Sequence, residues 1–521
     1  MRLLSRAGAV VLAAALLVVV VHTVVSPLYG AYRWSTAPSL VVAAVLVVAL
    51  LPATLALARC AGWLEGHPWP RRTLVALALA GIFYAQVQIG WAIRLPPGWD
   101  ASQVAGIAER MALGLPDDPG QVSYISTYPN NALVVAVLHL WDAFTISRGN
   151  PDLWAAAVVL VAGAMTSAVA LAYLAARRMG GPVAAYLLLA FSVVFVALSP
   201  WVPVAYSDTL TMPFPAAVLY LFSLERSRRR TTTRVALWAA MAVVTMVGYA
   251  LKPTAVFALA AAALVALVVA VPTLRRSWRG VAACAAGVVA GVVVGTLLVG
   301  ELVSSWGMAT TDEAAPQRLG VTHFLKMGAQ QPPGAYNDYF GSYAEADVLE
   351  TRALPLEGRT RANLDRYLDR VADMGPVGYA RFLERKLTWT FGDGSFFAWG
   401  EGGMSVDPTP FLVTDPRSIS IQRWMGLHGD RYATTFSLWQ GTWLVVLLLV
   451  AAGALHRGRG LGSAATMARL SLLMLVAFLL LFEARARYVY LYLPYFLVLA
   501  SLSAALLTPV VAARVRRGRA G

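Results

Sequence analysis

Residues 280–300 read GVAACAAGVVAGVVVGTLLVG and contain no charged side chain. Two other runs, 7–32 and 40–58, also lack Asp, Glu, Lys and Arg. An apolar run of about 20 residues is long enough to cross the hydrocarbon core of a membrane as a helix. None of the three runs alternates with the period of two that is typical of a barrel strand. The sequence therefore predicts an all-α, polytopic membrane protein.

The composition of the whole chain agrees with this fold class. Of the 521 residues 13% are charged, and the mean hydropathy is +0.64, whereas a soluble domain has about 25% charged residues. Arg2 and Arg6 precede the first apolar run as in a signal peptide, but that run is longer than a usual signal and more spans follow. We expect an uncleaved first span. The two cysteines, Cys60 and Cys284, imply no disulfide framework.

The distribution of charge predicts the topology. Residues 306–434 hold 16 acidic and 13 basic residues, and the rest of the chain holds 29 basic and 11 acidic residues. Most of these basic residues form short clusters between apolar runs, at 71–72, 177–178, 226–234, 275–279, 457–459 and 514–519. Each cluster marks a cytoplasmic loop by the positive-inside rule. The net charge of +15 therefore reflects membrane topology, and we expect membrane lipids and no nucleic acid as partners.

Twelve spans place every arginine cluster inside and both termini in the cytoplasm. The expected spans are 8–28, 38–58, 73–94, 152–176, 183–200, 209–224, 235–251, 254–272, 280–303, 436–455, 464–482 and 488–508. The apolar stretch 131–144 is short and contains His139, Trp141 and Asp142, so we interpret it as a helix in the membrane interface. The alternative is that it spans the membrane and that the charge rule fails once.

This threading divides the chain into five parts. They are an N-terminal group of three spans (1–94), a first external loop with juxtamembrane helices (95–151), six further spans (152–305), an external domain (306–434), and three last spans with a basic cytoplasmic tail (435–521). Within the external domain, residues 361–374 and 377–391 are expected to form two helices. The localisation that follows is a multi-pass protein of the cell membrane.

Two isolated carboxylates are expected at the outer ends of spans. Asp100 follows the third span in the motif Pro-Pro-Gly-Trp-Asp, and Asp208 begins the sixth span in Ala-Tyr-Ser-Asp-Thr. Ionisable groups in such positions are costly and usually functional. We interpret Asp100 and Asp208 as catalytic candidates, with Asp208 also a possible ligand for Mg²⁺ or Mn²⁺. The alternative for both residues is a helix N-cap.

Three cations are also predicted to face outside. Lys252 is one of three lysines in the chain and precedes Pro253, while Arg485 and Arg487 lie in Phe-Glu-Ala-Arg-Ala-Arg-Tyr between two apolar spans, against the positive-inside rule. Arginine suits bidentate contacts with phosphate, so these residues are candidates for phosphate binding. The alternatives are snorkelling of Lys252 to the interface and a Glu–Arg pair in a loose loop.

A third group of residues has the chemistry of a sugar or acceptor site, because aromatic rings stack on sugars while acids and amides bind hydroxyl groups. The alternative is an ordinary aromatic belt in the membrane interface. The candidates are Tyr128, Asn130, Trp389, Asp393, Glu401 and Glu483.

This layout resembles the GT-C superfamily of membrane glycosyltransferases, in particular the protein-O-mannosyltransferase and aminoarabinose-transferase type. Trp99-Asp100, the helix expected at 102–113 and the helix opened by Tyr-Pro-Asn-Asn at 128–131 are similar to the catalytic first loop of that family. Asp208 is similar to its second acidic residue, and Arg485 and Arg487 to its phosphate-binding arginines. The chain departs from the family pattern in having two spans before the one that leads to Asp100.

The resemblance implies a GT-C-like fold and a sugar donor carried on polyprenyl phosphate, transferred with inversion to a glycan, lipid or protein acceptor. Asp100 would then be the general base, and the three cations would stabilise the leaving phosphate. Two other classes of function remain open, a flippase or transporter for lipid-linked glycans and a non-catalytic protein of cell-wall assembly. The sequence shows no inverted repeat of the kind found in many transporters.

Overall fold

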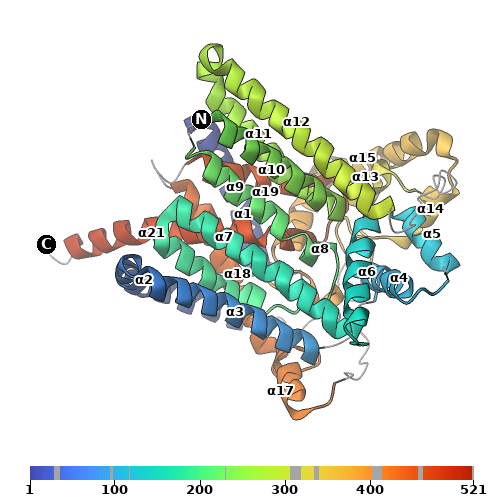
Figure 1. Cartoon of the computed structure of the whole chain (residues 1–521), viewed down its shortest axis with the longest axis horizontal. Helices are drawn as coiled ribbons and strands as arrows, with labels where there is room; N and C mark the ends of the chain where they lie inside the picture. Colours follow the sequence, from blue (N-terminus) through green and yellow to red (C-terminus); the bar gives the residue numbers. More distant parts are fainter. Residues whose placement is uncertain are drawn as a thin grey trace.

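The computed structural model describes residues 1–28, 36–93, 98–116, 118–228, 230–304, 318–333, 339–401, 413–455 and 462–518, with the side chains of 273–276 and 508–518 left aside. The described parts of the chain are helical and contain no strand. Figure 1 shows most of the long helices gathered in one bundle, with the described parts of residues 98–147 and 318–391 at one end of it.

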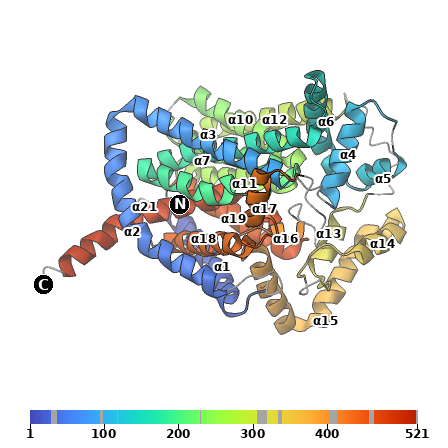
Figure 2. The same ribbon diagram turned by 90° about the horizontal axis from the view of Figure 1, so that it is seen from below.

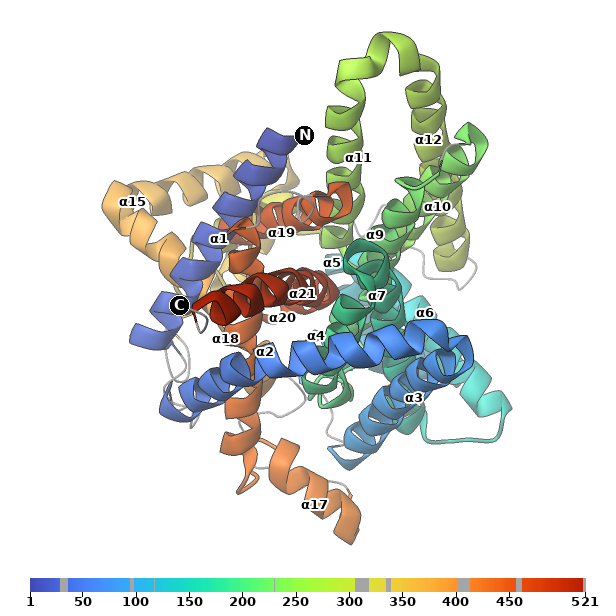
Figure 3. The same cartoon turned by 90° about the vertical axis from the view of Figure 1, so that its left-hand side faces the viewer.

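Nine helices in the described residues are long and apolar enough to cross a membrane. They are α1 (Arg2–Val25), α2 (Thr36–Gly66), α3 (Pro68–Ala92), α7 (Leu153–Ser192) with the π turn η2 (Val193–Ala197), α10 (Thr231–Leu251), α11 (Val256–Ala270) with the 3₁₀ turn η3 (Pro253–Ala255), α12 (Leu274–Ser304), α18 (Tyr432–Ala452) with η6 (Gly453–Leu455), and α19 (Ser463–Leu481). Figure 3 shows α11 and α12 as a helical hairpin joined through η4 (Val271–Thr273). The expectation of a multi-pass, all-helical membrane protein is confirmed.

The expected number of twelve spans exceeds this count by three. Residues 152–176 and 183–200 are counted together as one candidate span, but the helix breaks at Gly181, with φ +79°, between these two expected spans. Glycine adopts that conformation without steric cost, and Pro182 lacks the amide hydrogen that would continue the ladder. Of the other two expected spans, 209–224 contains a helix that is too short, whereas 488–508 contains a long helix whose side chains are described only as far as residue 507.

Each of these two expected spans divides into a helix of four residues and a longer helix, with a turn between them that the apolar pattern did not reveal. Residues 209–224 divide into α8 (Ser207–Leu210) and α9 (Pro213–Glu225), of which α9 has 13 residues. Residues 488–508 divide into α20 (Arg487–Tyr490) and α21 (Leu493–Gly518), a helix of 26 residues of which Leu493–Leu507 is the described apolar part. Each break lies close to a residue of the candidate site.

The first loop, which the sequence predicts to be external, forms α4 (Asp100–Ala112), α5 (Pro119–Thr127), the 3₁₀ turn η1 (Pro129–Asn131) and α6 (Ala132–Ser147). In Figures 1 and 2 α6 runs at a steep angle to α3 and α7, across their ends. With 16 residues it is also shorter than the nine candidate spans. This arrangement fits the interfacial helix that the sequence predicts.

The segment 306–434, called the external segment after its predicted location, forms α13 (Val321–Gly328), α14 (Glu345–Ala353), α15 (Leu356–Phe391), α16 (Ala398–Glu401) and α17 (Pro416–Met425) in its described parts. The two helices expected at 361–374 and 377–391 are confirmed, because α15 breaks at Gly375, with φ +62°, directly before Pro376. The segment after α15 packs into the bundle through Phe396, whose ring lies 5.0 Å from that of Trp443 and 4.9 Å from that of Tyr490. This contact fixes Glu401, five residues later, beside the last spans.

Candidate functional site

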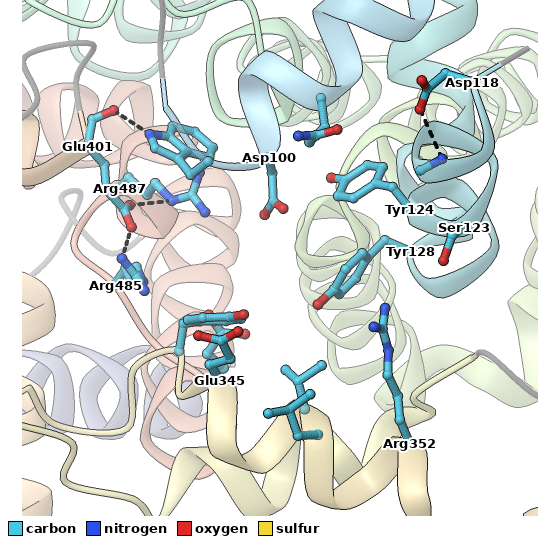
Figure 4. Close-up of a pocket in the computed structure, with 17 residues that line it drawn as sticks. Asp100, Asp118, Ser123, Tyr124, Tyr128, Glu345, Arg352, Glu401, Arg485 and Arg487 are labelled. Carbon is cyan, nitrogen blue, oxygen red and sulfur yellow. Dashed lines mark hydrogen bonds and ion pairs between the residues drawn. The ribbon is translucent and has the colours of Figure 1, made fainter.

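A cavity of about 750 Å³ opens where the first loop, the external segment and the turn after α19 meet. Figure 4 shows acidic and basic side chains facing one another across it, with two tyrosines on the side of α5. Its lining residues are Trp99, Asp100, Gln103, Asp118, Gly120, Ser123, Tyr124, Tyr128, Tyr343, Glu345, Val348, Leu349, Arg352, Glu401, Glu483, Arg485 and Arg487. These residues come from four parts of the chain that are distant in sequence.

Asp100 is the first residue of α4, and its carboxylate points into the cavity. Trp99 occupies the N-cap position, where its side chain makes no capping hydrogen bond. Trp99 has φ +63°, a conformation that is strained for a bulky residue and that is often found at functional sites. Its indole Nε1 donates to the Glu401 carbonyl oxygen at 3.0 Å. This contact joins the first loop to the external segment, and the capping alternative for Asp100 is wrong. The residues that precede Gly98 in the motif, Pro96 and Pro97, lie outside the described residues.

Two tyrosines form the wall of the cavity that faces the arginines. The rings of Tyr124 and Tyr128 lie 5.2 Å apart. Asn131 positions the first of them, because its Nδ2 donates to the Tyr124 hydroxyl at 2.7 Å while its Oδ1 accepts from Tyr206 at 3.2 Å. Burial raises the pKa of both Tyr124 and Tyr128 above the ordinary value. At neutral pH both hydroxyl groups are therefore protonated and can donate hydrogen bonds.

Asp208 belongs to a buried cluster of ion pairs with Lys252 and Arg487. It has 1% exposure, and its Oδ1 accepts from Lys252 Nζ while its Oδ2 lies 3.5 Å from Arg487 NH1. Tyr206, not Asp208, is the N-cap of α8, so the capping alternative for Asp208 is also wrong. Lys252 is buried rather than snorkelling, and its Nζ lies 4.2 Å from the centroid of the Tyr488 ring.

Glu401 connects the two arginines of the predicted phosphate site. Its carboxylate oxygens pair with Arg485 NH1 and, at 2.9 Å, with Arg487 Nε. The Arg487 guanidinium also lies over the Trp99 ring, with its carbon 4.0 Å from the centroid. Burial lowers the pKa of Arg485 to about 10, which leaves the guanidinium charged at neutral pH. Both arginines are thus cationic and have their carboxylate partner at the edge of the cavity.

Glu483 also lines the cavity, and it accepts a hydrogen bond from the Tyr488 hydroxyl at 2.9 Å. Burial raises the pKa of this carboxyl, although Tyr488 and Arg487 act in the opposite direction. Nearby, Lys386 Nζ donates to the carbonyl oxygens of Gly328, Leu480 and Phe482 at 2.6 to 3.0 Å. Lys386 thereby fastens α15 to the end of α19 and fixes the position of the turn that carries Glu483.

Three of the predicted sugar-binding residues do not line the cavity. Asp393 is buried, and its oxygens accept from the Ser395 amide and hydroxyl, the Phe397 amide and the Trp399 indole at 2.7 to 2.8 Å. Trp389 is buried against other rings, and Asn130 Nδ2 lies 3.4 Å from Asn131 Oδ1. Asp393 and Trp389 therefore build the support on which Glu401 rests.

The expected role of Asp208 as a metal ligand does not fit the geometry. Both of its oxygens face cations, and a divalent cation next to Lys252 and Arg487 would be repelled. Among the described residues no group of three or more His, Cys, Asp or Glu is arranged to hold a metal ion. Five carboxylates and three arginines line the cavity, and Glu401 pairs with two of these arginines.

Several cavity residues were not selected from the sequence as site candidates. Tyr343, Glu345 and Arg352 belong to the external segment, where charged residues are common and no spacing distinguishes them. Arg352 donates from NH2 to Thr127 Oγ1 at 2.7 Å, so it closes the cavity against α5. Tyr124 carried a sequence signal, because it opens the polar stretch 124–131 that precedes the apolar run of α6.

A family model matches the chain over residues 11–507. The matching family is described as "Conserved hypothetical integral membrane protein". The chain belongs to this family. The match supports an integral membrane protein, as the composition and the helices do, and the family description names no activity. No curated protein and no solved structure is significantly similar to the chain.

The region that matches the family model contains every residue of the cavity, from Trp99 to Arg487. The first loop, the external segment and the last spans all fall inside the matched region.

Proposed function

We propose that this protein is a glycosyltransferase of the cell membrane, with a GT-C-like arrangement of spans and an active site on the external face. In this proposal it transfers a sugar, with inversion, from a polyprenyl-phosphate donor to a glycan, lipid or protein acceptor. The observation that carries the proposal is the convergence of Asp100, Glu483, Arg485 and Arg487 on one cavity, next to the paired Lys252 and Asp208.

The two sides of the cavity suit the two halves of a displacement reaction. The acceptor hydroxyl oxygen attacks the anomeric carbon, and its proton passes to the Asp100 carboxylate. The bond between the anomeric carbon and the phosphate oxygen breaks, and its electron pair stays on the polyprenyl phosphate. Arg485 and Arg487, on the opposite side from the tyrosines in Figure 4, stabilise that charge. The products are the glycosylated acceptor and the lipid phosphate.

The charges of the cluster restrict how a donor phosphate can bind. Three carboxylates (Asp208, Glu401 and Glu483) already match the three cations (Lys252, Arg485 and Arg487) in number. A donor phosphate therefore brings excess negative charge. The least costly adjustment is for the phosphate to replace Glu401 as the partner of Arg485, because Glu401 lies at the edge of the cavity whereas Asp208 is enclosed. Glu401 thus acts as a placeholder for the donor phosphate.

A direct test incubates the purified protein with a panel of polyprenyl-phosphate sugars and an extract of cell-envelope acceptors, and measures released lipid phosphate together with labelled product. The expected result is one-to-one release of lipid phosphate and transfer of sugar with one donor of the panel. Movement of intact donor across vesicles without its cleavage would instead indicate a flippase. Partner binding without either activity would indicate an assembly protein.

The external face is tested by cysteine labelling. In a Cys60→Ala background, Thr360→Cys, at an exposed position on α15, should react with an impermeant maleimide on intact cells, and Thr232→Cys, at an exposed position on α10, should react only after permeabilisation. The opposite pattern would place the cavity on the cytoplasmic side and remove the reason for a lipid-linked donor.

A further inference from the structure

A second cavity of about 350 Å³ lies between α3 and α7. Four of its lining side chains are polar, namely Arg71 and Arg72 in the first turns of α3 and Tyr173 and Arg177 on α7. In Figures 1 and 2 the start of α3 is at the end of the bundle away from α4 and α5. The cavity is therefore at the opposite end from the first one, on the face that the arginine clusters predict to be cytoplasmic.

The charges at this cavity are not balanced by protein groups. Arg177 pairs with both oxygens of Glu65 at 2.7 and 2.8 Å, and Arg71 shares one of these oxygens at 3.2 Å. Among the described residues Arg72 has no carboxylate partner and lies near the exposed Trp69 ring, 5.9 Å from its centroid. Three guanidinium groups therefore lie near one carboxylate, which pairs with two of them, and the site keeps a net charge of about +2.

The rest of the lining is aliphatic. Val75 and Leu79 are one helical turn apart on α3, and Ala76 and Leu174 lie beside them. Because α3 continues from this turn as a candidate span to Ala92, the aliphatic wall runs from the arginines toward the membrane interior. A soluble anion would use the arginines alone, whereas a ligand with a charged head and a hydrocarbon chain would use both parts of the lining.

We propose that this cavity binds the headgroup of an anionic phospholipid, with its phosphate on Arg72 and Arg177 and an acyl chain along Val75, Ala76 and Leu79. Basic pockets between membrane helices on the cytoplasmic side are suited to such headgroups. The site is independent of the proposed transfer reaction. It ties α3, which leads to Asp100, to α7 through the lipid as well as through direct packing.

The test is native mass spectrometry of the delipidated, full-length protein with phosphatidylglycerol or with phosphatidylcholine of the same chains. We expect retention of phosphatidylglycerol only. Arg72→Gln should weaken this binding about fivefold, as expected from the contribution of one arginine near a charged lipid surface, and the double variant with Arg177→Gln should weaken it further. The matched control is Arg178→Gln, because Arg178 bonds to Ser227 instead and does not line the cavity.

A third variant separates a lipid from free phosphate. Ala76 is exposed, so Ala76→Trp should fill the aliphatic wall without disturbing the core, and it should abolish retention of phosphatidylglycerol. Displacement of the lipid by millimolar inorganic phosphate, with no effect of Ala76→Trp, would show a phosphate site and overturn the proposal. Equal retention of the two lipids, or equal loss in Arg178→Gln and Arg72→Gln, would also overturn it.

Discussion

Two carboxylates of the main site differ in everything except their residue type. Asp100 faces an open cavity and two tyrosine hydroxyls, whereas Asp208 is enclosed and has both oxygens against cations. The first is in a position to meet a substrate, and the second holds Lys252 and Arg487 in place. The comparison teaches that a carboxylate at the outer end of a span has no fixed role, because the role depends on what the rest of the fold brings to it.

The largest expected effect is on the rate of sugar transfer when Asp100, the carboxylate in the open cavity, is replaced. Asp100→Asn keeps the size of the side chain but cannot accept a proton, so transfer should fall by about 10²–10⁴-fold while donor binding and thermal stability are retained. Sugar transfer is measured under saturating donor. Glu109→Gln on the same helix is the control, because Glu109 does not line this cavity. A near-native rate in Asp100→Asn would show that another residue is the general base. Asp100 and Asp208 would then no longer differ in the way proposed here.

Replacement of Asp208, the enclosed carboxylate, is expected to lower the stability of the folded protein. Asp208→Asn leaves Lys252 and Arg487 as buried cations without their shared partner, and breaking a buried pair costs about 3–5 kcal/mol. The thermal midpoint in detergent should fall accordingly. Glu345→Gln, at an exposed carboxylate on the cavity rim, should leave it unchanged. If Asp208→Asn is as stable as the native protein, Asp208 does not anchor the cluster.

The stretch 393–401 offers a second comparison of the same kind. Asp393 accepts four hydrogen bonds within its own turn, and Glu401 pairs across the cavity edge with two arginines. Asp393→Asn turns an amide NH₂ toward these donors and should cost about 1–3 kcal/mol of stability. The rate of the folded fraction should stay within a few-fold of native. A large loss of rate without loss of stability would move Asp393 into the reaction.

The smallest expected effect is a gain in donor affinity when a cavity residue, Glu401, is replaced. Glu401→Gln removes the charge that competes with the donor phosphate for Arg485, so donor affinity should rise by about 1 kcal/mol, or roughly fivefold. Equilibrium binding of a polyprenyl-phosphate sugar measures it. Weaker binding in this variant would mean that Glu401 contacts the donor directly and is not a placeholder.

Much of the fold follows from the sequence, because a membrane span needs a long uncharged run and the chain has many of them. The starts of two spans were less accurate. Residues 209–224 divide into α8 and α9, and residues 488–508 divide into α20 and α21, so each expected span contains a turn near its start. Apolar length shows where a helix is stable in a membrane. It does not show where a turn shortens that helix to position a buried charge such as Asp208 or Arg487.

The sequence by itself determined that charged residues are rare here and that Asp100, Asp208, Lys252, Arg485 and Arg487 stand apart from the cytoplasmic clusters. Their rarity is informative because an unpaired charge in or near a membrane is costly, so those that remain must have partners or a purpose. The tertiary structure alone decided the pairing, since Lys252 meets Asp208 across 44 residues and Arg485 meets Glu401 across the last two spans. Ion pairing depends on distance in space, which helix packing sets and sequence spacing does not.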